Sequence, residues 1–163
     1  DSMNGVGIFD GDIAVIEKGE EALQQLLPRE SKSKFIDLAL LSLIYPFNIV
    51  PEKTAREIIR HMEYHLEKEK GIIRYKSDRY YNKNEDEVSE EAEWCFGFPW
   101  LSIIYSQLGN PSKAQEYLKK SFKTIYQDQI PELYYSDSDK PNENTPLGWA
   151  ESLFVVALLK AGK

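Results

Sequence analysis

The sequence predicts an all-α fold of stacked helical hairpins, for which an α/α toroid is the leading arrangement. Three segments are apolar on nearly every face and are expected inside the protein, at 35–45, 92–108 and 146–162. The segments 52–70 and 110–127 alternate with them and carry one polar face each, so they are expected outside. This order suggests an inner ring of parallel helices and an outer ring that runs back, and a solenoid of helical pairs is the alternative.

Proline and glycine mark the expected ends of the first helices. The segment Gly11 to Leu27 gives a weaker helical signal than those that follow it. Pro46 ends the first apolar helix, and Pro51 suits the first turn of the next. Gly71 then follows the amphipathic pattern and is a candidate for its C-cap.

The later helices follow the same rules. Pro99 predicts a kink or a late start in the apolar helix over 92–108. Asn110 and Pro111 have the side chains expected of an N-cap and a first turn. Pro146 is expected to open the last apolar helix.

Composition is that of one globular domain. The chain has 163 residues, of which 42% are hydrophobic and 29% charged, so a substantial core is expected and disorder is not. A single domain over 1–163 is predicted, with residues 1–30 at its periphery. The net charge of −7 argues against nucleic acid or an anionic membrane as the partner. One free thiol and no signal-peptide pattern favour a cytoplasmic location.

Neither the cysteine nor the histidines indicate a metal or a cofactor. Cys95 lies in an apolar segment and is interpreted as a buried, inert thiol. His61 and His65 have the i, i+4 spacing of two ligands on one helix face, but no third ligand is indicated. The prediction is therefore no metal site and no cofactor.

Two long loops are the candidate functional segments. Each has about 20 residues, is rich in aromatic and acidic side chains, and leads into an apolar helix, at Gly71–Glu93 and Gln129–Pro146. Compact helical domains rarely need connections of this length, and long loops on a rigid scaffold often carry function. In a toroid or a solenoid, loops that lead into inner helices share one rim, so the two are expected to converge.

Five short motifs follow one another through these loops: GIIRY at 71–75, Asp78 with YYN at 80–82, EEAEWCFGFPWL at 90–101, IPE at 130–132 and PLGW at 146–149. Their order and spacing resemble glycoside hydrolase family 15, which includes glucoamylases, glucodextranases and trehalases. They also resemble the related N-terminal domains of phosphorylase kinase α and β subunits. The resemblance extends over about 35–163.

The resemblance implies roles for particular residues. Glu132 corresponds to the Glu of the family segment L-P-E-Q, which is the catalytic base of an inverting glycosidase, and here Leu133 replaces the Gln. Arg74 is expected to hold sugar hydroxyls, because a guanidinium presents several donors rigidly. The other implied substrate-binding residues are Tyr75, Asp78, Tyr80, Trp94 and Trp100. The implied substrate is an α-linked glucose chain or a small α-glucoside.

The resemblance also implies that the chain is the C-terminal half of a six-hairpin toroid of the glycosidase type. The catalytic acid of the family lies farther before the base than Asp1 lies before Glu132. The acid is therefore expected upstream, and the chain alone is expected to be inactive. A half toroid exposes inner-helix surface, which predicts association with the missing half or with a second copy.

Alternative interpretations remain open for the residues and for the function. Arg74 could pair with Asp78 or Glu91 as a structural ion pair, and Trp94, Trp100 and Trp149, on apolar helices, could belong to the core. The first functional alternative is a non-catalytic, phosphorylase-kinase-like regulatory or sugar-binding domain. The second is a helical repeat scaffold that binds peptides, which would leave the two long loops unexplained.

Overall fold

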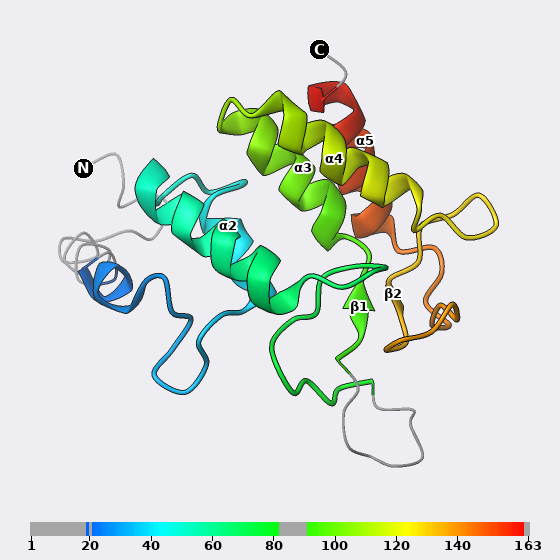
Figure 1. Cartoon of the computed structure of the whole chain (residues 1–163), viewed down its shortest axis with the longest axis horizontal. Coiled ribbons are helices and arrows are strands. Elements are labelled where there is room, and N and C mark those ends of the chain that lie inside the picture. The colour runs from blue at the N-terminus through cyan, green and yellow to red at the C-terminus, as the bar shows by residue number, and fades with distance from the viewer. Residues whose placement is uncertain (1–18, 20, 82–90, 162–163) are drawn as a thin grey trace, which may run out of the picture.

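The computed structural model describes residues 19, 21–81 and 91–161, and within them the fold is helical. Figure 1 shows the arrangement of its elements, which are the 3-10 helix η2 (Leu38–Leu43), α2 (Glu52–Leu66), β1 (Glu93–Trp94), α3 (Gly97–Gln107), α4 (Pro111–Phe122), β2 (Leu133–Tyr134) and α5 (Gly148–Ala161). The predicted helical class is confirmed. In the described residues no helix has both the length and the apolar character that crossing a bilayer requires.

Helix α3 is the centre of the described fold and packs against both α4 and α5 (Figure 1). Every residue from Gly97 to Tyr105 is buried, as the all-round apolar pattern predicts. Helix α4 buries one face, formed by Ala114, Tyr117, Leu118 and Ser121. The alternation of buried and amphipathic helices is therefore confirmed through α4, and it is that of part of a helical toroid.

Helix α5 departs from the prediction that it is buried on all sides. Only Ala150, Leu153 and Ala157 are buried, whereas Val155 is 54% and Leu159 66% exposed. The neighbours of α5 are α3 and α4, and these cover one side of it. The apolar pattern predicts cover on several sides of α5, and the described residues supply it on one.

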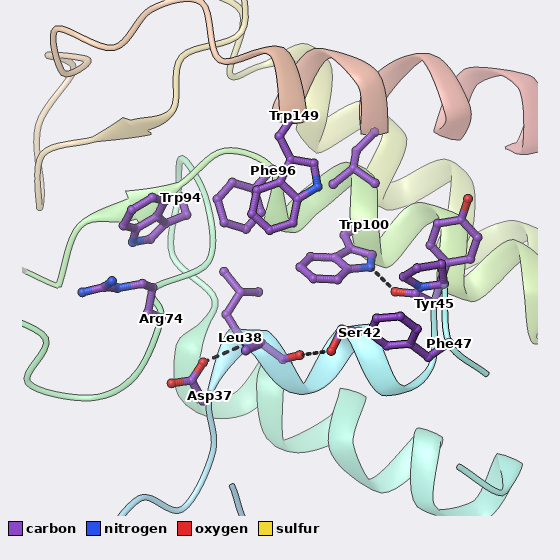
Figure 2. A pocket seen from close by; sticks show the side chains of 13 residues that line it. Asp37, Leu38, Ser42, Tyr45, Phe47, Arg74, Trp94, Phe96, Trp100 and Trp149 are labelled. Carbon is purple, nitrogen blue, oxygen red and sulfur yellow. Dashed lines mark hydrogen bonds between the residues drawn. The ribbon is translucent and has the colours of Figure 1, made fainter. Parts of the chain in front are cut away.

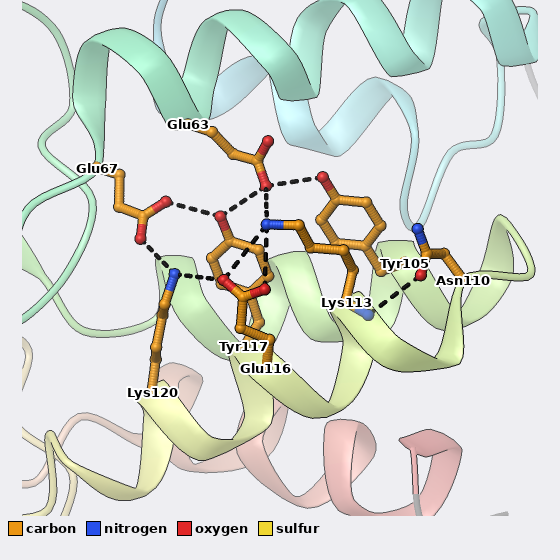
Figure 3. Close-up of polar contacts among 8 residues, drawn as sticks. All are labelled: Glu63, Glu67, Tyr105, Asn110, Lys113, Glu116, Tyr117 and Lys120. Atoms are coloured by element: carbon orange, nitrogen blue, oxygen red, sulfur yellow. Dashed lines mark hydrogen bonds and ion pairs between the residues drawn. The ribbon is translucent and has the colours of Figure 1, made fainter.

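A polar network joins the two amphipathic helices, α2 and α4 (Figure 3). The Tyr117 hydroxyl lies 2.7 Å from a carboxylate oxygen of Glu63 and 2.7 Å from one of Glu67. Lys120 Nζ donates to the other oxygen of Glu67 at 2.6 Å. Burial, followed by the two carboxylates, raises the pKa of the Tyr117 phenol, so it stays protonated and links the helices as a donor.

Several predicted helix ends are wrong by a few residues. The apolar segment at 35–45 forms only the short 3-10 helix η2, which begins after Asp37, whose side chain accepts from Ala39 N–H. Helix α2 ends at Leu66, because Glu67 is extended and pairs with Ile72. Helix α4 ends at Phe122 rather than at 127.

Three expectations for proline and glycine have mixed outcomes. Helix α3 begins at Gly97, so Pro99 lies in its first turn and the predicted late start is confirmed. Gly71 is not a C-cap, since α2 has already ended. A Cβ at Gly71 would lie 2.6 Å from the Trp94 carbonyl oxygen, so this glycine permits close backbone approach. Helix α5 begins two residues after Pro146.

The antiparallel pair β1–β2 brings the two long loops together. Glu93 pairs with Tyr134 and Trp94 with Leu133, and Ile72 bridges to Trp94 on the other side. Strands this short were not predicted from the sequence, because their pairing depends on contacts between distant segments. Of the weaker helix predicted from Gly11 to Leu27, residues 19 and 21–26 are helical, and 1–18 and 20 lie outside the described residues.

Candidate functional site

The two long loops converge at one rim, as predicted. The hydroxyl of Tyr81 in the first loop donates to Glu132 Oε2 in the second at 3.2 Å. In the main chain, Cys95 N–H donates to the Glu132 carbonyl at 3.1 Å. The residues 82–90 of the first loop, Glu90 among them, lie outside the described residues.

Glu132 is held by neutral donors. Besides Tyr81, the side-chain amides of Asn142 and Asn144 donate to Oε2 at 2.6 and 2.7 Å. Burial, followed by the negative charge of Glu132, raises the pKa of the Tyr81 phenol, so this residue stays a donor. Within the described ranges, no cation and no donor contacts Glu132 Oε1. This oxygen is therefore open to a ligand or to water.

Arg74 and Asp78 form a bidentate ion pair. Arg74 Nε and Nη2 donate to the two carboxylate oxygens at 2.6 and 2.8 Å, and Asp78 is only 1% exposed. Burial raises the pKa of Asp78, but the hydrogen bonds from Arg74 and from Tyr80 N–H outweigh it, and the pKa lies below its ordinary value. The ion-pair interpretation is therefore confirmed for Asp78.

The pair leaves part of Arg74 available. Its guanidinium lies 4.6 Å from the ring centre of Tyr80 and 5.2 Å from that of Trp94. Nη1 donates to no acceptor in the described part of the chain. Arg74 also lines the cavity described next, so the ion pair with Asp78 anchors a residue of the cavity wall.

An aromatic cavity of about 690 Å³ lies between η2, β1, α3 and α5 (Figure 2). Its aromatic residues are Tyr45, Phe47, Trp94, Phe96, Trp100 and Trp149. Phe96 and Trp149 are stacked with ring centres 4.4 Å apart, and Trp100 meets Trp149 edge-on at 5.5 Å. Asp37, Ser42 and Arg74 supply the polar side chains of this lining. A volume and lining of this kind fit a small organic ligand.

The predicted substrate-binding residues divide into two groups. Arg74, Trp94 and Trp100 line the cavity, whereas Glu132 and Asp78 do not. Glu132 is nevertheless close to it, because the ring of its donor Tyr81 meets Trp94 edge-on at 6.1 Å. Tyr75 and Tyr80 lie outside the cavity too, and both flank Arg74. Substrate contacts by any of these residues stay predictions.

Trp94 and Trp149 differ from their expected places, whereas Trp100 lies on the apolar helix as expected. Trp94 lies in β1 and not on a helix, and its Nε1 is buried without a hydrogen-bond partner in the described chain. Trp100 is buried and donates from Nε1 to the Tyr45 carbonyl at 2.8 Å (Figure 2). Trp149 is 51% exposed, so its assignment to the core is wrong. The one covered side of α5 explains this difference.

The sequence analysis assigned no role to Tyr81 or Phe96, which lie within the motifs, or to Asn142 and Asn144, which lie outside them. Tyrosine and asparagine recur in both loops, and only the pairing of the loops distinguishes the three that contact Glu132. In the described residues no group of three metal-ligating side chains occurs. His61 and His65 stack on each other at 5.9 Å and both meet Phe35. Cys95 is fully buried, and burial raises its pKa.

Comparisons with known proteins agree with this fold. No family model matches the chain. An uncharacterised glycosyl hydrolase of Methanocaldococcus jannaschii is 29% identical over 149 residues, which cover 80% of this chain and 22% of that protein. The α regulatory subunit of phosphorylase b kinase from Oryctolagus cuniculus skeletal muscle is 27% identical over 202 residues, which cover 99% of this chain and 16% of the subunit.

Two solved structures of a glycosidase share the fold. The wild-type protein has a TM-score of 0.68 at 15% identity, and a variant in complex with glucose has 0.67 at 14%. Each similarity covers 94% of this chain and 45% of the glycosidase.

The fold and the relatives define a helical protein of the glycosidase-like class. Within that class the chain is related to glycosyl hydrolases and to phosphorylase kinase regulatory subunits, as its motifs predicted. It spans less than a quarter of the length of either curated relative. Membership of glycoside hydrolase family 15 itself stays a prediction.

Proposed function

We propose that the chain forms part of the substrate cleft of an inverting, glucoamylase-like glycoside hydrolase that acts on α-linked glucose chains or small α-glucosides. The observation that carries this proposal is the position of Glu132. Its carboxylate accepts three hydrogen bonds at Oε2 and none from the described residues at Oε1, and it lies close to an aromatic cavity whose wall includes Arg74. One structural neighbour is a glycosidase in complex with glucose, which supports a sugar ligand.

The proposed chemistry assigns a role to each group. Glu132 acts as the base that takes a proton from water as the water attacks the anomeric carbon. Arg74 Nη1 donates to a sugar hydroxyl, while Asp78 fixes the guanidinium from behind. The apolar faces of glucose rings pack on Trp94, Trp100 and Trp149. A second carboxylic acid must protonate the leaving oxygen, and we assign that role to no residue of this chain.

A non-catalytic, phosphorylase-kinase-like sugar-binding domain is the alternative. It is favoured by the similarity to a phosphorylase kinase subunit and by Leu133, which replaces the family's Gln. Leu133 is fully buried in β2, and successive side chains of a strand point to opposite faces. A buried leucine has no hydrogen-bonding group, so the side chain at 133 makes no hydrogen bond to Glu132, and the donors to this carboxylate are Tyr81, Asn142 and Asn144.

The test is sugar release and sugar binding, measured on the chain and on the longest natural protein that contains it. We expect the longer protein to release glucose from maltotriose or trehalose, and Glu132→Gln to lower kcat by about 10²–10⁴-fold with ligand affinity retained. Glu69→Gln, an exposed glutamate, is the matched control. Tryptophan fluorescence reports binding in both forms.

The outcomes separate the candidate functions. Sugar binding without turnover in the longer protein would favour the regulatory alternative. Neither binding nor turnover would favour the peptide-binding scaffold. We expect the chain alone to bind sugar without turnover, and release of glucose by the chain alone would contradict the proposed need for a further carboxylic acid.

We also propose that the exposed apolar side of α5 is covered in the functional protein. Val155, Leu158 and Leu159 form this surface with Trp149, and an apolar surface of this kind marks an interaction site. The missing part of a toroid and a second copy of the chain are the two candidate covers. Light scattering of the chain distinguishes them, because only the second predicts a dimer that Leu159→Lys dissociates.

A further inference from the structure

Three donors from two loops converge on a single oxygen of Glu132. Asn142 and Asn144 donate from Nδ2 at 2.6 and 2.7 Å, and the Tyr81 hydroxyl donates at 3.2 Å, all to Oε2. The donors also contact one another, because Asn144 Nδ2 lies 3.1 Å from the Tyr81 hydroxyl. Tyr81 can accept that bond and donate its own proton to Glu132, so the contacts are compatible.

The main chain holds the two asparagines in register with Glu132. Asn142 N–H donates to the Leu133 carbonyl at 3.1 Å, and Glu132 N–H donates to the Asn144 carbonyl at 3.3 Å. The segment around 141–144 therefore runs beside β2. Side chains two residues apart point to the same face of an extended segment, which places both amides on the carboxylate.

The orientation of Asn142 depends on a charged Glu132. Asn142 is only 4% exposed, and its Oδ1 has no hydrogen-bond partner in the described residues. Turning the amide over would place Oδ1 against the Glu132 carboxylate, where two acceptors repel. A buried unsatisfied acceptor lowers stability by about 1–3 kcal/mol, so packing alone does not account for an asparagine at this position.

The second oxygen of Glu132 is left for chemistry. In the described part of the chain Oε1 accepts no hydrogen bond, although Oε2 accepts three. A general base works best when its reactive oxygen is aimed at the water and its other oxygen is fixed. Neutral donors fix the carboxylate without a cation that would bind the reactive electron pair.

We propose that Tyr81, Asn142 and Asn144 form a three-donor cradle that positions Glu132 so that Oε1 is the proton-accepting oxygen. This inference rests on the proposed function. In the step concerned, the water oxygen bonds to the anomeric carbon, the bond to the leaving oxygen breaks, and the water proton passes to Oε1. A separate carboxylic acid gives its proton to the leaving oxygen. The cradle residues act through their hydrogen bonds to Glu132, so they are positioning residues.

The test compares cradle variants in the longest natural protein that contains the chain. We expect Asn142→Ala to lower kcat by about 10²-fold, and Asn144→Ala and Tyr81→Phe by about 10-fold, with KM for maltotriose changed less than about twofold. Asn144 is exposed, so its variant should fold even if that of Asn142 does not. Tyr126→Phe, outside the cradle in the turn just before the loop that carries Glu132, is the matched control.

The same substitutions made in a Glu132→Gln protein separate a positioning role from general damage to the site. In a Glu132→Gln protein the cradle substitutions should change the residual rate by less than about twofold, because they act only through Glu132. Equal losses in both backgrounds, or a loss confined to KM, would overturn the cradle. Turnover that needs Glu132 but is indifferent to all three substitutions would also overturn it and leave the proposed function standing. Absence of turnover in the unsubstituted protein would overturn both.

Discussion

Asp78 in the first loop and Glu132 in the second are both fixed carboxylates, but they are fixed in opposite ways. Both oxygens of Asp78 bind the Arg74 cation, and the side chain is buried. Only one oxygen of Glu132 is bound, by three neutral donors, and the residue is half-buried. A carboxylate whose charge is neutralised on both oxygens can anchor a structure, whereas one held at a single oxygen keeps a basic site.

The two carboxylates, held in these different ways, also lie at different places beside the cavity. Asp78 orients Arg74 between Tyr80 and Trp94, so the ion pair shapes the cavity wall without itself lining it. Glu132 lies beside the same wall through Tyr81. The comparison predicts that substitutions at the ion pair affect stability most and that substitution of Glu132 affects it least.

The largest expected effect on stability follows from removing the Arg74 guanidinium. Arg74→Met leaves the buried carboxylate of Asp78 without its partner, and the free energy of unfolding should fall by about 3–5 kcal/mol. Urea denaturation of the chain measures this change. Arg79→Met, an exposed arginine of the same loop, is the control and should change it by less than about 0.5 kcal/mol. If Arg74→Met lowered the free energy of unfolding as little as Arg79→Met, the Arg74–Asp78 pair would not anchor the structure.

The pH dependence of stability gives a second, smaller effect at Asp78. Its pKa is lower in the folded than in the unfolded state, so its contribution is present above the unfolded pKa and is lost as pH falls through the folded one. Asp78→Asn should reduce stability at pH 7 by about 1–3 kcal/mol and flatten the acid side of the stability profile. Asp128→Asn, in an exposed turn, is the control for the removal of one acidic side chain.

Glu93, in the same region, should give stability the opposite pH dependence. It is 2% exposed, and burial raises its pKa despite the hydrogen bond from Lys70 N–H. Its contribution to stability is therefore full below the unfolded pKa and is lost as pH rises through the folded pKa. Glu93→Gln should therefore raise stability at pH 7 more than at pH 3, where the glutamate is protonated in both states. If Glu93→Gln instead lowered stability more at pH 7 than at pH 3, the expected pH dependence would be wrong.

These two acids also indicate how far the sequence could predict the site. The hydrophobic pattern predicted buried α3, amphipathic α2 and α4, and therefore the shared rim, because periodicity reports which faces need cover. It could not predict that Trp149 is half-exposed, since an apolar side chain does not specify what covers it. The Arg74–Asp78 pair was foreseen because i, i+4 neighbours in one loop are local in sequence.

The donors of Glu132 were beyond sequence reasoning for a different reason. Tyr81 lies 51 residues from Glu132, and their contact depends on the two-residue pair β1–β2. Asn142 and Asn144 reach the carboxylate only because the main-chain register beside β2 places both on one face. A motif can point to Glu132, but the groups that hold it are defined by long-range pairing.

The smallest expected effect on stability is at Glu132 itself. Glu132→Gln retains an acceptor oxygen for the cradle and leaves no buried cation unpaired, so the free energy of unfolding should change by less than about 1 kcal/mol. Urea denaturation beside Arg74→Met measures both ends of the comparison in one experiment, with Glu69→Gln as the control. A loss at Glu132 close to that at Arg74 would make both carboxylates structural anchors. A small loss of stability together with a large fall in turnover would instead distinguish Glu132 from Asp78. Such a result would mean that Glu132 contributes to the reaction and little to the fold, and that other residues maintain its position.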